Sequence, residues 1–123
     1  MTLADSAGPY SPVVRTGGWL VCSGQLGASG GVLVDGGVGA QVTQAMANLS
    51  DLLAPFGASL GDVVKTTVFL TDIAHYDEMN RAYIAALGDH RPARSAIAVV
   101  ALPLGAGVEI EAWARVPGAS SNP

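Results

Sequence analysis

With 123 residues, half of them apolar, the chain can bury the core of one domain. Its net charge of −4 and its scattered basic residues argue against binding to the phosphate backbone of a nucleic acid. A lone cysteine, Cys22, excludes an intramolecular disulfide and is typical of a protein from a reducing compartment.

Hydropathy and the first residues add expectations about assembly and location. The mean hydropathy is +0.40, and the chain has only six basic and ten acidic residues. Such a composition predicts apolar surface that is buried against other copies, so we expect an oligomer. The N-terminal residues lack the basic and long apolar stretches of a signal peptide, and no apolar run is long enough for a membrane span. We therefore expect a cytoplasmic protein that does not act on membranes.

The first third of the chain is predicted to form turns and short strands. Residues 8–12, Gly-Pro-Tyr-Ser-Pro, favour a turn, and residues 19–23 favour a strand. A glycine-rich loop is predicted over residues 24–31, and a second strand over residues 32–35.

Two amphipathic helices with a strand between them are predicted next. Apolar residues recur every three or four positions over residues 40–56, which indicates a helix that ends near Gly57. The β-branched residues of 63–71 favour a central strand. Asp72 is expected to cap a second helix that ends at Gly88. The apolar face of this helix is predicted to consist of Tyr76, Met79, Tyr83, Ile84 and Leu87.

Two strands are predicted at the end of the chain, over residues 94–101 and 107–116. The order of two strands, helix, strand, helix and two strands predicts an α+β fold, with one mixed sheet and two helices on one of its faces. Residues 1–116 are expected to form this single domain, and residues 117–123 a flexible C-terminal tail.

Arg94 and Glu109 are the charged residues of these last strands that suggest a functional site. A charge in an apolar strand is costly to bury unless it is paired with another group or takes part in function. Arg94 is either an ordinary surface residue that closes a helix–strand loop or a bidentate clamp for a carboxylate. Glu109 shares a strand face with Glu111. This alternation alone favours a solvated outer face over a carboxylate that handles protons.

The spacing of these strands argues against a site within one chain. If they formed a hairpin that turns at residues 104–105, Arg94 and Glu109 would lie about six residues apart along the strands, roughly 20 Å. Either the two strands are not neighbours in the sheet, or the site is assembled between subunits. The apolar run of residues 96–104 is typical of a strand that lies between subunits.

Four other residues are candidates for either the site or the core. Ser23 has no nearby histidine, so a hydroxyl that binds substrate is favoured over a hydrolase triad. Cys22 points to the opposite side and is expected in the core. Tyr10, held between prolines, is either a packing residue or the rigid wall of a pocket. Asn80 is either a polar surface residue of its helix or a buried hydrogen-bond partner.

Several chemistries lack their motifs in the sequence. The loop of residues 24–31 lacks the Gly-Lys-Ser/Thr ending of a phosphate-binding loop. No cluster of His, Cys and carboxylate residues has metal-ligand spacing, so no metal site is expected. Lys65, the single lysine, lies mid-strand, where exposure on the sheet surface is favoured over a Schiff-base role.

Seven short motifs follow one another between residues 5 and 116. They are Gly-Pro-Tyr-Ser-Pro at 8–12, Ser-Gly-Gln at 23–25, Gln44-Ala with Asn48, Asp-Val-Val-Lys-Thr-Thr-Val-Phe-Leu at 62–70, Asn80 with Tyr83, Pro-Ala-Arg-Ser at 92–95, and Val-Glu-Ile-Glu-Ala at 108–112. In this order and at these intervals they resemble the RidA family, also called the YjgF family. Each motif alone is weak evidence for this resemblance, whereas the whole series in order is strong evidence.

The resemblance implies a homotrimer of chorismate-mutase-like α+β subunits with sites in the clefts between them. It implies hydrolysis, without a cofactor, of reactive 2-imino and enamino acids (2-aminoacrylate, 2-iminopropanoate and 2-iminobutanoate) to 2-keto acids and ammonia. By position, Arg94 would hold the substrate carboxylate and Glu109 would position or activate the attacking water, which overrules the solvated-face interpretation. The pocket would be lined by Tyr10, Ser23, Gly24, Asn80 and Ala96.

Ala96 departs from the family pattern, because members often carry a cysteine two residues after the arginine. A main-chain contact there would survive, whereas a thiol-dependent role would not. The main alternative function is a trimer that binds a keto acid without turnover. An endoribonuclease or translation inhibitor, roles reported for some members, fits the acidic composition poorly, and nothing specific supports a holdase.

Overall fold

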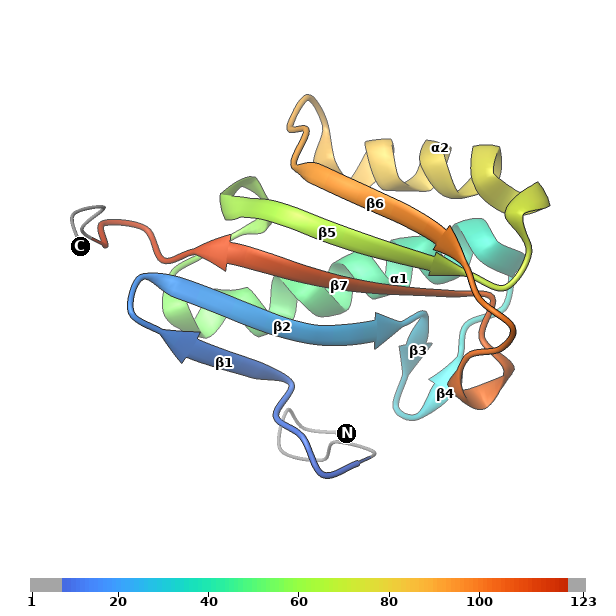
Figure 1. The fold of residues 1–123 in the computed structure, drawn as a ribbon, viewed down its shortest axis with the longest axis horizontal. Coiled ribbons are helices and arrows are strands. Elements are labelled where there is room, and N and C mark those ends of the chain that lie inside the picture. The colour runs from blue at the N-terminus through green and yellow to red at the C-terminus, as the bar shows by residue number, and fades with distance from the viewer. Residues whose placement is uncertain (1–7, 120–123) are drawn as a thin grey trace.

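The computed structural model describes residues 8–119, in which a five-stranded mixed sheet carries two α-helices on one face (Figure 1). The main sheet consists of β1 (Val13–Thr16), β2 (Trp19–Leu26), β5 (Val63–Leu70), β6 (Ala93–Ala98) and β7 (Val108–Arg115), and a small hairpin consists of β3 (Ala28–Ser29) and β4 (Val32–Leu33). The helices are α1 (Gly37–Leu53) and α2 (Tyr76–Leu87). Residues 120–123 of the predicted tail lie outside the described residues.

The strand order in the sheet is β1-β2-β7-β5-β6. Strands β5 and β6 are parallel, and the remaining neighbours are antiparallel. The last two strands of the chain are therefore not neighbours, because β5 lies between β6 and β7. The predicted α+β class, the mixed sheet and the helices on one face are confirmed.

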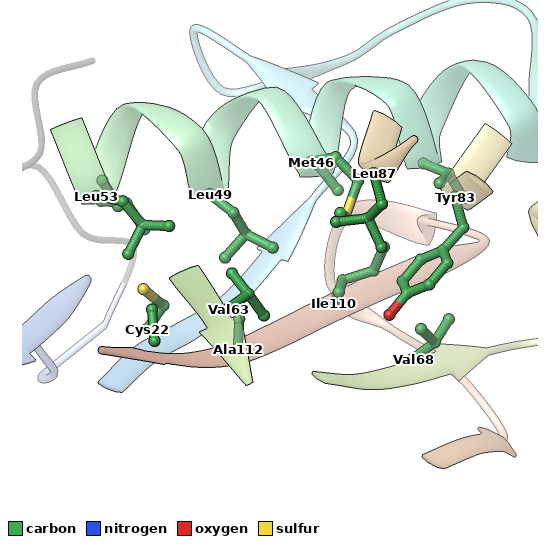
Figure 2. Packing of buried hydrophobic residues seen from close by; sticks show 14 of the residues in the cluster. Cys22, Met46, Leu49, Leu53, Val63, Val68, Tyr83, Leu87, Ile110 and Ala112 are labelled. Carbon is green, nitrogen blue, oxygen red and sulfur yellow. The ribbon is translucent and has the colours of Figure 1, made fainter. Parts of the chain in front are cut away.

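The core lies between this sheet and its helices. The apolar stripe of α1 packs on β2 and β7, whose inward residues include the small side chains of Cys22 and Ala112 (Figure 2). The fully buried members of α1 are Val42, Ala45, Met46, Leu49, Leu52 and Leu53. Ala112 and Ala114 of β7 are fully buried beneath the helices. Cys22 is buried as predicted, and burial raises the pKa of its thiol to about 11.

The start of α1 is capped from another helix. Gly36 and Gly37 turn the chain into α1 with φ angles of 114° and 82°, and no side chain at that position caps the helix. Instead a carboxylate oxygen of Glu78, on α2, accepts a hydrogen bond of 2.7 Å from the backbone N–H of Gly39. This contact ties the two helices together and places a negative charge at the positive end of α1.

Replacing Glu78 with alanine is expected to lower the free energy of unfolding by about 1 kcal/mol, because the first turn of α1 loses its acceptor. Glu78→Gln keeps an acceptor oxygen without the charge and is expected to lose less. Chemical denaturation of both variants measures the difference. Equal stability of Glu78→Ala and the unmodified chain would refute the capping role.

Several predicted boundaries were wrong for physical reasons. Residues 24–31 are not one loop, because β2 continues to Leu26 across an irregularity between Cys22 and Gln25. Gly27 is required there by packing, since a Cβ would lie 2.3 Å from the α-carbon of Gln41 on α1. The edge strand β1 was not predicted. The strand predicted over residues 94–101 ends at Ala98 in the structure.

The second helix also differs in detail from its prediction. Asp72 accepts a hydrogen bond from the N–H of Ala74 and so caps the short 3-10 turn Ile73–His75, which leads into α2. Met79, Tyr83 and Leu87 are buried as predicted. Tyr76 and Ile84 were wrongly assigned to the buried face, since they are 39% and 47% exposed. Neither α-helix within residues 8–119 is long and apolar enough to cross a membrane.

Candidate functional site

Arg94 and Glu109 lie on opposite faces of the sheet. In the strand register Arg94 lies opposite Thr66, whose buried side chain faces the helices. Glu109 lies opposite Phe69 and belongs to the face of β7 that the helices leave uncovered. Because successive side chains of a strand point to opposite faces, a single chain cannot bring the two groups together.

Four side chains of α2 surround the guanidinium of Arg94. Nη1 donates to Oδ1 of Asn80 at 2.7 Å and lies 3.7 Å from Sδ of Met79. Nη2 donates to the hydroxyl of Tyr76 at 3.0 Å. The guanidinium also stacks near the rings of Tyr76 and Tyr83, at 5.6 and 4.9 Å from their centroids. We call Arg94 and these four residues the arginine cluster.

Helical spacing and one buried hydrogen bond build this cluster. Tyr76, Asn80 and Tyr83 stand at positions i, i+4 and i+7 of α2, so they form one stripe along the helix. The hydroxyl of Tyr83 shares a hydrogen bond of 2.6 Å with the buried hydroxyl of Thr66 on β5, which fixes α2 against the sheet. Arg94 therefore has a defined direction before any ligand binds, and its fork can receive a carboxylate.

An open cavity of about 300 Å³ adjoins the arginine cluster. Its lining combines two cationic side chains and one amide with aromatic and apolar ones: Asn80, Tyr83, Ile84, Arg91, Pro92 and Arg94. Ala96 follows on the same face of β6, where its small side chain packs against the core.

Glu109 stands among apolar neighbours on the uncovered face. Its partners in the register are Leu26 of β2 and Phe69 of β5. Gly24 leaves the space that the carboxyl group occupies, since a Cβ there would lie 2.7 Å from the carboxyl carbon. Burial, followed by the negative charge of Glu111, raises the pKa of Glu109 above its ordinary value of 4.5. Such a carboxylate is a stronger base than an ordinary surface glutamate.

Ser23 lies on the uncovered face of β2, and its hydrogen bonds join it to the segment that carries Tyr10. The hydroxyl of Ser23 donates to the backbone carbonyl of Ser11 at 2.7 Å, and the N–H of Ser23 donates to the carbonyl of Pro12 at 2.8 Å. These bonds fasten the Gly-Pro-Tyr-Ser-Pro turn to β2 beside Gly24. Tyr10 itself is 52% exposed.

The predicted site residues thus fall into two groups. Arg94, Asn80 and Ala96 belong to the helix side and the edge strand β6. Ser23, Gly24 and Glu109 belong to the uncovered face, and the Tyr10 turn is attached to them. Tyr76 was missed, because periodicity assigned it to the apolar face of α2. Among residues 8–119 there is no group of three His, Cys, Asp or Glu side chains that could hold a metal ion.

Comparison with known proteins shows the family to which the chain belongs. The model of the family described as endoribonuclease L-PSP matches residues 2–116. The chain belongs to this family, the RidA (YjgF) family. The RidA resemblance of the seven motifs is therefore confirmed over nearly the whole chain.

Individual RidA-family relatives are similar over most of their length. A human protein named 2-iminobutanoate/2-iminopropanoate deaminase is 42% identical over 109 residues, which are 87% of this chain and 80% of the relative. A Schizosaccharomyces pombe protein named mmf1, mitochondrial, is 40% identical over 87% of this chain and 67% of its own length. Because that name places a relative in mitochondria, the cytoplasmic location stays a prediction.

A solved structure confirms that the fold is that of the family. The crystal structure of Escherichia coli TdcF with bound serine superposes with a TM-score of 0.84 at 31% identity. The match covers 89% of this chain and 90% of TdcF.

Proposed function

We propose that the chain hydrolyses reactive 2-imino acids, such as 2-iminopropanoate and 2-iminobutanoate, to 2-keto acids and ammonia. The observation that carries the proposal is a preformed guanidinium fork combined with a carboxylate of raised pKa. A carboxylate clamp and a base are what a 2-imino acid needs for hydrolysis. The human relative that bears the deaminase name supports the substrate class.

In the proposed reaction Arg94 holds the substrate carboxylate and Glu109 accepts a proton from water. The water oxygen bonds to C2 while the electron pair of the C2=N bond moves to nitrogen. Nitrogen takes up the two protons that the water loses, the C2–N bond breaks, and ammonia leaves. The water oxygen remains as the keto oxygen of the product. The chemistry calls for no cofactor, because Glu109 can accept and return the proton.

We further propose that the active form is a homotrimer of chorismate-mutase-like subunits, with each site formed by two chains. Arg94 and Glu109 lie on opposite sheet faces, so one site can contain both only if Arg94 of one chain meets Glu109 of another. The uncovered face is also rich in exposed apolar side chains, as expected for a face that is buried against another copy. These are Val14, Trp19, Ile97 and Trp113, at 37–50% exposure.

Mixing two inactive variants tests the two-chain site. If Arg94→Ala and Glu109→Gln chains are unfolded together and refolded in equal amounts, mixed trimers contain one interface with both native residues. In a cyclic trimer about a quarter of all sites should then regain activity. The rate of 2-iminobutanoate loss, with an amino-acid oxidase as the source of the imine, measures the recovery.

The two variants refolded separately are the control for this experiment and are expected to stay inactive. Solution mass, measured on the same samples, tests the trimer. Recovery near zero in a mixture of proven trimers would contradict the two-chain site. Full activity of each variant alone would contradict the roles of both residues.

Gly24 provides a further test, because the carboxyl group of Glu109 occupies the space of its missing side chain. Gly24→Ala is expected to displace the carboxyl group and to lower kcat by about tenfold or more, since a base displaced by about 1 Å loses its alignment. Gly61→Ala is the matched control, because its Cβ would meet only the hydroxyl of Ser59 at 3.6 Å. Equal kcat values for the two variants would contradict the proposed position of Glu109.

Binding of a keto acid without turnover is the second candidate function. It is favoured by the arginine cluster, which is complete within one chain, whereas Glu109 is not near it. Saturable binding of 2-oxobutanoate without faster loss of any 2-imino acid would support binding alone. RNA cleavage that depends on Arg94 or Glu109 would instead favour the activity in the family's description.

A further inference from the structure

We propose that the hydroxyl of Tyr76 binds the substrate carboxylate together with Arg94 and fixes the direction of the guanidinium. The inference deepens the proposed function and rests on it, because the ligand is the same 2-imino acid. Tyr76 opens α2, is 39% exposed, and holds its hydroxyl oxygen 3.0 Å from Nη2 of Arg94. An ordinary residue of an apolar helix face would be buried and would need no polar partner.

The direction of this hydrogen bond leaves a proton available at Tyr76. A guanidinium has donors and no acceptor, so the hydroxyl oxygen of Tyr76 must accept from Nη2. Its own O–H hydrogen takes no part in that bond and can donate elsewhere. Because the two donor atoms are 3.0 Å apart, both can reach a single carboxylate oxygen at normal hydrogen-bond length. A carboxylate bound there would receive a charge-assisted bond from each.

The other groups of the arginine cluster differ from Tyr76 in this respect. The hydroxyl of Tyr83 is engaged with Thr66 in the core, at 2.6 Å, and only the ring of Tyr83 lies near the guanidinium. Sδ of Met79 is a weak acceptor without a proton to give. Asn80 accepts from Nη1 through Oδ1, which keeps Nη1 pointing toward α2. Tyr76 is therefore the hydroxyl of the cluster that is both exposed and able to donate.

Replacing Tyr76 with phenylalanine tests the inference, since it removes the hydroxyl and keeps the ring beside Arg94. Calorimetric titration with 2-oxobutanoate, the stable product, is expected to show affinity weakened by about tenfold or more. In the imine assay KM is expected to rise by a similar factor, with a much smaller change in kcat. The NMR signals of the Arg94 Nη hydrogens are expected to broaden, because Nη2 loses its acceptor.

Glu78→Ala is the comparison, because it weakens the packing of the same turn of α2 and removes no group of the arginine cluster. Since the first turn of α1 loses its acceptor, we expect a lower melting temperature with near-native affinity for 2-oxobutanoate. Equal loss of affinity in both variants would overturn the inference, because it would indicate a structural effect alone.

The outcome also separates this inference from the proposed function. If Arg94→Ala abolishes binding of 2-oxobutanoate while Tyr76→Phe binds as the unmodified chain does, the role of Tyr76 is refuted and that of Arg94 stands. If the unmodified chain neither binds 2-oxobutanoate nor accelerates imine loss, the proposed function itself fails.

Discussion

Replacing Arg94 with alanine is expected to lower kcat/KM for 2-iminobutanoate by about 2–4 kcal/mol, or roughly 30- to 1,000-fold. The substrate carboxylate would lose a guanidinium that Asn80 and Tyr76 hold in a fixed direction. The remaining donors of the cluster cannot replace a charged, planar fork. The rate of imine loss and the affinity for 2-oxobutanoate should therefore fall together.

Two further variants separate the effects of positive charge and of a damaged fold from the effect of losing the paired guanidinium donors. Arg94→Lys keeps a positive charge without the paired donors, so we expect a rate between those of Arg94→Ala and the unmodified chain. Arg81→Ala removes an exposed arginine from the same helix and is expected to have a near-native rate. An Arg94→Ala protein that folds and still turns over 2-iminobutanoate at the native rate would remove the basis of the proposed function.

The layers of the fold could be predicted from the sequence because the helices and the central strand have strong local patterns. The apolar stripe of α1 and the β-branched run of β5 specify their own structure. The neighbours of each strand could not be predicted in this way. Strands β6 and β7 follow one another in the chain, yet β5 lies between them. That order depends on how α2 returns the chain to the sheet edge, which no local pattern encodes.

The candidate site was predictable in part for a similar reason. Alternation along β7 predicted that Glu109 shares the outer face with Glu111, and the structure confirms it. The face of Arg94 depends on which side α2 covers, so its strand alone could not reveal it. Tyr76 has the spacing of an apolar residue, and only the position of Arg94 beside the first turn of α2 gives its hydroxyl a partner.

Glu109→Gln is expected to lower kcat for imine hydrolysis by about 10²- to 10⁴-fold while leaving the affinity for 2-oxobutanoate near native. Glutamine retains the shape and one acceptor oxygen but cannot take a proton from water. Binding should persist because Arg94 is proposed to hold the ligand carboxylate, whereas Glu109 is proposed to contact the attacking water. Steady-state kinetics and calorimetric titration of the same preparation measure both quantities.

The pH dependence gives a second measure of Glu109. Since burial and Glu111 raise its pKa, the acidic limb of kcat/KM should lie above the ordinary value of 4.5. Glu111→Gln removes the neighbouring negative charge and is expected to shift this limb to lower pH, with kcat at neutral pH near native. A limb that does not move in Glu111→Gln would contradict the proposed electrostatic coupling of the two residues.

Stability distinguishes a lost base from a damaged fold. Because folding raises the pKa of Glu109, the folded chain binds its proton more tightly than the unfolded chain does. The resulting stabilisation is present below pH 4.5 and is lost as the pH rises through the raised pKa, so ionised Glu109 opposes folding at neutral pH. Glutamine carries no charge, and Glu109→Gln should melt at the same temperature or higher. An inactive Glu109→Gln protein that melts well below the native chain would instead attribute the lost activity to structure.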